Sequence, residues 1–146
     1  MSRAFVKDDD TGPEPTFIRP VTDAPNYVTP QGLEQLREAL AQAEAAKNDR
    51  EIRYYNERIE SAILVDPKSR KGDRVQFGAT VVAHDNRGRP LKVRIVGEDE
   101  ADPVHGSISF ESPIAKALMD HRPGEDVLVQ RPAGPIQYTI DTVTYE

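Results

Sequence analysis

Two apolar stripes with helical spacing, joined by a short polar stretch, constrain this chain more than any other feature. The first stripe is Leu33, Leu36, Leu40 and Ala43, and the second is Ile52, Tyr55, Ile59 and Ala62 with Ile63. Spacings of three and four residues place each stripe along one helix face, as a narrow seam for a single partner helix. Only Lys47–Arg50 separates the stripes, so the two helices are predicted to pair antiparallel as a helical hairpin over residues 27–66.

The predicted hairpin has clear end signals. Thr29 is a favourable N-cap, and Pro30 suits the first helical position because its missing N–H would have no partner there. Pro67 disfavours helical backbone at the residue before it, so the second helix is expected to end at Leu64–Asp66. Each arm is then about 16–18 residues long, roughly 25 Å, and the pair needs support at its base.

The rest of the chain alternates between strand-like runs and turn residues. Strands are predicted over residues 74–83, 91–96, 106–110, 127–130 and 137–145, with a short helix over 113–119 that begins after Ser112. The fold class is therefore α+β, with the helical hairpin followed by a largely antiparallel five-stranded sheet carrying one helix over residues 72–146. Residues 1–26 hold an acidic run and four prolines, and are predicted to be an extended or disordered tail.

Composition excludes several classes of protein. The chain has no cysteine, so disulfides, thiolate metal sites and Cys nucleophiles are ruled out. No apolar run approaches the ~20 residues of a membrane span and no signal peptide is visible, so a cytoplasmic protein without a membrane partner is expected. The net charge of −6 argues against broad contact with nucleic-acid backbone. Residues 47–94 nevertheless carry an excess of basic groups between acidic ends, which suits docking on charged surfaces.

Few residues are candidates for chemistry. The three histidines lack metal-ligand spacing, and neither a phosphate-binding loop nor a nucleophile-elbow serine is present, so no intrinsic catalytic or metal site is predicted. The acidic cluster Glu98–Asp102 is predicted to be a solvated turn. At the hairpin tip, Asp49 and Glu51 are two carboxylates that could share a divalent metal with another protein's acidic site. Ordinary turn and helix-dipole preferences explain the same two residues.

An ordered series of motifs runs through residues 72–146. Its segments are Ile95–Asp102, Gly106–Leu118, Gly124–Val127, Pro132–Gly134, Tyr138 and Val143–Tyr145. This series, which includes Ser-Pro-x-Ala-x-Ala-Leu and Pro-x-Gly, resembles the docking domain of the Gre transcript-cleavage factors, GreA and GreB. The hairpin is similar to the coiled coil of that family, with Tyr27–Leu33 at its opening and Asp49-Arg50-Glu51 at its acidic tip. Its arms are shorter by roughly two heptads each, or about 20 Å of reach.

The resemblance implies an FKBP-like docking domain that binds bacterial RNA polymerase at the secondary channel and contacts nucleic acid only indirectly. It assigns the polymerase contact to Glu111, Ser112 and Pro113. No cofactor is implied beyond a Mg²⁺ that Asp49 and Glu51 would share with the polymerase, the chain itself being no enzyme.

Three functions are compatible with this resemblance. One is an elongation factor that stimulates RNA cleavage by docking more deeply than its longer relatives. The second, which the short hairpin favours, is a non-cleaving competitor of Gre factors, similar to the regulators of nucleoside diphosphate kinase. The third is an FKBP-like prolyl isomerase, which the scarcity of aromatic residues for a proline pocket disfavours.

Overall fold

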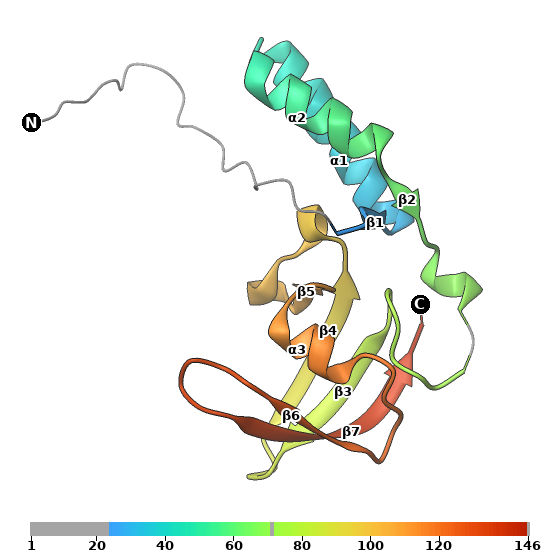
Figure 1. The fold of residues 1–146 in the computed structure, drawn as a ribbon. Helices are drawn as coiled ribbons and strands as arrows, with labels where there is room; N and C mark the ends of the chain where they lie inside the picture. The colour runs from blue at the N-terminus through green and yellow to red at the C-terminus, as the bar shows by residue number, and fades with distance from the viewer. Residues whose placement is uncertain (1–23, 71, 146) are drawn as a thin grey trace, which may run out of the picture.

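The protein combines a pair of helices with a small β domain, as the computed structural model in Figure 1 shows. The structure describes residues 24–70 and 72–145. The predicted N-terminal tail, residues 1–26, therefore lies outside the described residues except for its last three, of which Asn26 is buried. None of the helices in the described part of the chain is long and apolar enough to cross a membrane.

Helices α1 (Pro30–Ala45) and α2 (Asp49–Glu60) lie side by side and form the predicted antiparallel pair (Figure 1). Thr29 caps α1 as predicted, since its hydroxyl oxygen accepts the Gly32 N–H at 3.0 Å. Leu36 and Ala43 of the first stripe are buried in the seam. The α+β class with two N-terminal helices is thus confirmed.

Helix α2 is shorter than the sequence predicts, because it ends at Glu60 instead of continuing to Leu64. Beyond it, β2 (Ile63–Leu64) runs parallel to β1 (Tyr27–Val28). The main-chain N–H groups of Ile63 and Val65 donate to the carbonyl oxygens of Asn26 and Val28, both at 2.8 Å. These amides are therefore bonded to the β1 segment and not to a further helical turn.

The β domain is a five-stranded sheet in the order β5-β4-β3-β7-β6. Its strands are β3 (Thr80–Asp85), β4 (Pro90–Val96), β5 (Ser107–Ser109), β6 (Asp126–Val129) and β7 (Ile136–Thr144). Three pairings are antiparallel, as expected for a largely antiparallel sheet, whereas β4 and β5 run parallel, so the sheet is mixed. Between these two strands the 3-10 turns η2 (Glu98–Glu100) and η3 (Pro103–His105) bring the chain back far enough that β5 runs beside the last three residues of β4.

The core of the β domain extends into the base of the hairpin. Helix α3 (Pro113–Leu118) packs Ala115 and Leu118 into a cluster with the inward side chains of the sheet. Tyr27 of β1 packs against the same cluster, its ring centroid 5.7 Å from that of Phe77 and 5.4 Å from that of Phe110. The strand that leads into the hairpin is therefore held by the core of the β domain.

Candidate functional site

The hairpin tip is a three-residue link between two capped helices. Lys47 adopts the left-handed conformation with φ +55°, and its N–H donates to the Glu44 carbonyl oxygen at 3.1 Å. The Asn48 N–H reaches back to the Ala43 carbonyl oxygen at 3.0 Å, which completes a Schellman-type end to α1. The Asn48 side chain then accepts the Glu51 N–H at 3.1 Å and caps α2. The turn predicted over Lys47–Arg50 is therefore shifted, because Asp49 already belongs to α2.

The structure places the two tip acids on the first turn of α2 but does not bring them together. Residues two apart on a helix do not face each other, and here Asp49 is exposed whereas Glu51 is half-buried. Glu51 lies one turn before Tyr55, whose pKa is raised by burial and then by the Glu51 and Asp99 carboxylates. Among the described residues no group of three or more acidic or imidazole side chains could hold a metal ion. A metal-sharing role for Asp49 and Glu51 stays a prediction.

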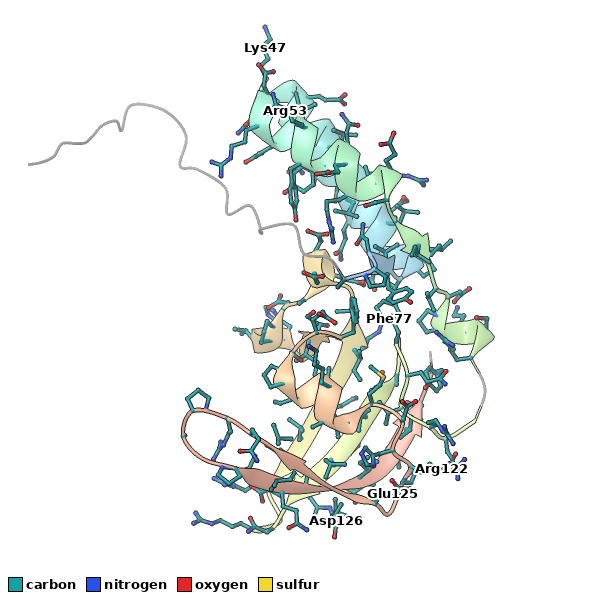
Figure 2. All side chains as sticks on the ribbon, in the orientation of Figure 1. Lys47, Arg53, Phe77, Arg122, Glu125 and Asp126 are labelled. Atoms are coloured by element: carbon teal, nitrogen blue, oxygen red, sulfur yellow. The ribbon has the colours of Figure 1, made fainter. Side chains whose placement is uncertain are left out.

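Exposed cations surround these acids. Lys47, Arg50 and Arg53 all reach solvent at the free end of the hairpin. Figure 2 shows Lys47 and Arg53 there, with Phe77 far from them where the hairpin meets the β domain. The tip thus presents charges of both signs on a rigid turn.

The predicted docking residues Glu111, Ser112 and Pro113 form an exposed corner between β5 and α3. The Ser112 hydroxyl oxygen accepts the Ala115 N–H at 3.3 Å, which confirms Ser112 as the N-cap of α3. The Glu111 N–H donates to Ser109 Oγ at 3.0 Å, and its carboxylate lies 3.8 Å from the Lys116 ammonium. Glu111 and Pro113 are exposed while Ser112 is half-buried, so the corner is both accessible and conformationally fixed.

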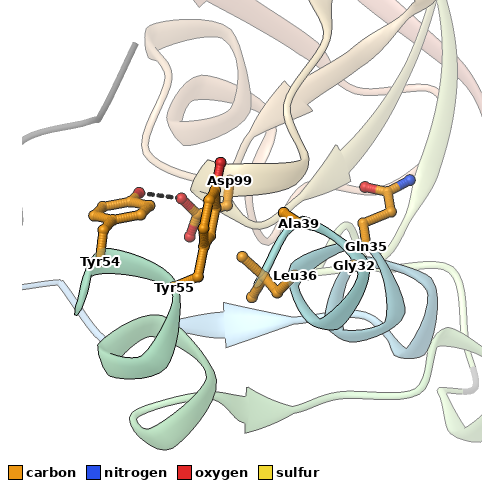
Figure 3. A pocket seen from close by; sticks show the side chains of 7 residues that line it. All are labelled: Gly32, Gln35, Leu36, Ala39, Tyr54, Tyr55 and Asp99. Atoms are coloured by element: carbon orange, nitrogen blue, oxygen red, sulfur yellow. Dashed lines mark hydrogen bonds between the residues drawn. The ribbon is translucent and has the colours of Figure 1, made fainter. Parts of the chain in front are cut away.

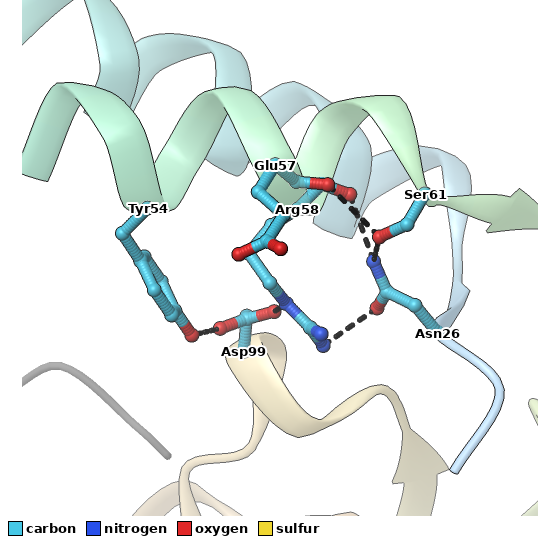
Figure 4. Close-up of polar contacts among 6 residues, drawn as sticks. All are labelled: Asn26, Tyr54, Glu57, Arg58, Ser61 and Asp99. Carbon is cyan, nitrogen blue, oxygen red and sulfur yellow. Dashed lines mark hydrogen bonds and ion pairs between the residues drawn. The ribbon is translucent and has the colours of Figure 1, made fainter. Parts of the chain in front are cut away.

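Sequence reasoning missed a third constellation, which joins α2 to the β domain. Figure 4 shows it around Arg58, which is buried although it is charged. Arg58 Nε donates to Asp99 Oδ2 at 2.6 Å, and its Nη2 donates to Asn26 Oδ1 at 2.7 Å. The Tyr54 hydroxyl also donates to the Asp99 carboxylate. The only sequence signal is that Tyr54 and Arg58 are four residues apart and so share one face of the helix.

The acidic segment at η2 is therefore not the solvated turn that the sequence predicts. Glu98 is buried, and the side chain of Asp99 is only 12% exposed. Glu100 accepts a hydrogen bond from the Thr29 hydroxyl, at 2.6 and 2.8 Å to its two oxygens. Asp99 and Glu100 are thus the partners of polar groups of the hairpin.

A small pocket lies where α1, α2 and η2 meet. Its volume is about 270 Å³, and Figure 3 shows the side chains that surround it. The lining residues are Gly32, Gln35, Leu36, Ala39, Tyr54, Tyr55 and Asp99. The two tyrosine rings stand edge to face, with centroids 5.2 Å apart. The contacts of Arg58, Tyr54 and Thr29 with Asp99 and Glu100 of η2, together with those of Asn26, are called the joint. The pocket lies on the hairpin side of this joint.

Comparisons with known proteins find similar sequences over most of the chain. Residues 69–145 match the family described as "Transcription elongation factor, GreA/GreB, C-term". The transcription elongation factor GreB of Neisseria meningitidis serogroup B is 32% identical, and the match covers 85% of this chain and 96% of that protein. GreA of Pelobacter propionicus is 39% identical, with 73% of this chain and 71% of that protein covered.

Among solved structures, GreA factor homolog 1 of Thermus thermophilus is similar with a TM-score of 0.45 and 24% identity, covering 80% of this chain and 97% of that one. The family match takes in more than half of the chain, and the GreB relative is matched over nearly its whole length. The chain therefore belongs to the GreA/GreB transcription elongation factor family.

Proposed function

We propose that this protein binds bacterial RNA polymerase at the secondary channel, docking through its β domain and inserting the short hairpin. The observation that carries the proposal is the family match over residues 69–145, which is the β domain itself. Gre factors are not enzymes but act on RNA polymerase, whose RNA cleavage they stimulate. The fixed corner at Glu111–Pro113 supports docking there, because a rigid surface loses little conformational entropy on binding.

The length of the hairpin favours a protein that occupies the channel without stimulating RNA cleavage. Its helices have 16 and 12 residues, which at 1.5 Å per residue gives arms of about 24 and 18 Å. The alignment with the Neisseria GreB spans 157 positions, more than the 146 residues of this chain, so that relative has residues without a counterpart here. A hairpin shortened in both arms accounts for such a difference. Asp49 and Glu51 do not lie side by side, since one is exposed and the other half-buried. This separation also favours a non-cleaving competitor of longer Gre factors.

Stimulation of RNA cleavage is the second candidate function. Asp49 is exposed at the extreme end of the hairpin, where a carboxylate could join a Mg²⁺ held by the polymerase if the protein docks more deeply. A prolyl isomerase has less support. Phe77 and Phe110 pack against Tyr27 in the core, so neither lines an open pocket for proline.

Reversing the charge of the docking corner is expected to weaken binding to core RNA polymerase at least tenfold. The variant combines Glu111→Lys with Pro113→Ala, which removes both the exposed acid and the residue that fixes the start of α3. Affinity is measured by titrating fluorescently labelled protein with core enzyme. The matched control, Asp73→Lys with Pro123→Ala, alters an exposed acid and an exposed proline elsewhere on the domain. Equal affinities for the corner variant and the control would refute docking through this corner.

The cleavage question is decided on backtracked elongation complexes supplied with Mg²⁺. We expect the protein to displace a GreB with full-length arms while releasing no short 3′ RNA fragments, because its tip stops about 20 Å short. RNA products are followed on sequencing gels and GreB occupancy by fluorescence. Fragment release that disappears in Asp49→Ala/Glu51→Ala would instead establish cleavage stimulation and overturn the competitor assignment.

A further inference from the structure

We propose that two consecutive carboxylates, Asp99 and Glu100, are positioning residues that set the direction in which the hairpin leaves the β domain. Asp99 holds α2 through Arg58 and Tyr54, whereas Glu100 holds Thr29, the N-cap of α1. One short turn, η2, therefore holds both helices at once. Figure 4 shows the α2 side of this arrangement, where Asp99 faces Tyr54 and Arg58. The functional importance of this joint rests on the proposed function, but its geometry is a property of the free protein.

Burial fixes the geometry of the ion pair between Arg58 of α2 and Asp99 of η2. The side chains of Arg58 and Asp99 are only 7% and 12% exposed, so little water is available to replace either partner. An ion pair in such a setting is hydrogen-bonded in one geometry, and removal of one partner leaves the other charge buried and uncompensated. Arg58 Nη2 adds the contact to Asn26, so the buried guanidinium has partners on both η2 and the chain that enters β1.

Asn26 closes the joint from the other side. Its side-chain amide donates to the Arg58 carbonyl oxygen at 2.8 Å and to Ser61 Oγ at 3.1 Å. The segment entering the hairpin is thereby tied to the end of α2. Within the described residues, the segments that enter and leave the hairpin are paired through their main chains by β1 and β2, each only two residues long. A pair of that length is weak on its own. We therefore assign the angle between the hairpin and the β domain to the side-chain contacts.

The length of the hairpin amplifies small rotations at its base. With an arm of about 24 Å, a tilt of roughly 10° at the joint displaces the tip by roughly 4 Å. That distance is comparable to the size of the groups that a tip side chain must meet. A docked protein with a loosened joint would still contact the polymerase through its β domain, but its tip would sample many positions within the channel.

The free protein tests the geometry directly. Because the chain contains no cysteine, Arg50→Cys at the tip and Arg87→Cys in the β3–β4 turn can carry two spin labels without side reactions. Pulsed electron-spin measurements then report the distribution of the tip-to-domain distance. We expect one narrow distribution in the parent chain and at least a twofold broader one in Asp99→Asn/Glu100→Gln. The control Glu60→Gln, an exposed acid at the end of α2, is expected to leave the width unchanged.

A milder variant keeps the proposal falsifiable if the double variant fails to fold. Tyr54→Phe removes one hydrogen bond to Asp99 and no charge, and is expected to broaden the distribution measurably while the circular dichroism spectrum stays that of the parent. A distribution as narrow as the parent's in folded Tyr54→Phe and in folded Asp99→Asn/Glu100→Gln would overturn the proposal. A parent distribution that is already broad would overturn it as well.

Polymerase binding separates this inference from the proposed function. The variant Asp99→Asn/Glu100→Gln should bind core enzyme within threefold of the parent, because the corner at Glu111–Pro113 is untouched. In the spin-labelled complex with core enzyme, its tip-to-domain distance should nevertheless be distributed at least twofold more broadly than that of the parent. Equally narrow distributions in the two complexes would refute the positioning role. A parent chain that fails to bind core enzyme would refute the proposed function, and the distance distributions would then decide the joint alone.

Discussion

Gly97→Ala is expected to lower the free energy of unfolding by about 3 kcal/mol. A Cβ at this position would lie closer than 3.0 Å to the Tyr27 carbonyl oxygen, a separation that real Cβ atoms essentially never show. The backbone of Gly97, with φ −72° and ψ 165°, is open to any residue, so the cost comes from space and not from conformation. Equilibrium unfolding in urea measures the change.

Tyr27 cannot move away easily, which is why the expected effect is large. Its ring packs against Phe77 and Phe110, and its strand pairs with Ile63 of β2. Gly32→Ala is the matched comparison, since a Cβ there would meet the carboxylate of Glu100 at 2.5 Å, the end of a flexible side chain. Alanine stabilises a helix by up to about 1 kcal/mol relative to glycine. This gain offsets the disturbance of the hydrogen bond between Glu100 and Thr29. If Gly97→Ala proved no more costly than Gly32→Ala, the close approach of η2 to β1 would be refuted.

Phe110→Ala is expected to cost about 3–5 kcal/mol of unfolding free energy. Phe110 is buried, and its ring lies edge to face against those of Tyr27 and Phe77. Its removal leaves a cavity in the core at the point where the hairpin is anchored, so hydrogen exchange should also accelerate in β1. Unfolding in urea, followed by circular dichroism, measures the first effect.

Leu128→Ala serves as the control for this change, because Leu128 is a large apolar residue of the same sheet that is 56% exposed. Surface substitutions of this kind usually change stability by about 0.5 kcal/mol or less. A similar loss in both variants would contradict the placement of Phe110 in the core.

Local sequence patterns predicted the elements of this fold well. Caps and periodicity located α1 through Thr29 and Pro30, and α3 through Ser112. The strands near residues 91–96, 127–130 and 137–145 lie within a residue or so of β4, β6 and β7. These signals come from neighbours in the chain, which is why they can be recognised without the fold.

The relations between elements were harder to predict. The strand predicted from residue 74 begins only at Thr80, since Gly78 has φ +90° and interrupts extended chain. The parallel direction of β5 depends on the turns that precede it. Arg58 and Asp99 are 41 residues apart in the chain, and no local pattern links a helical arginine to an acidic turn. Asp49, Glu111 and Pro113 are exposed whereas Glu51 and Ser112 are half-buried. The roles of these tip and corner residues remain predictions.

Each end of the hairpin is closed by its own contacts, so the length of the two arms can change without altering either end. Caps at Lys47 and Asn48 close the far end, and contacts of Thr29 and Arg58 close the near end, while the stretch between them is a repeating seam. Matched seven-residue blocks inserted in both helices would therefore leave both ends unchanged and advance the tip by about 10 Å per block. The length of the hairpin and the structure of the β domain can thus evolve independently.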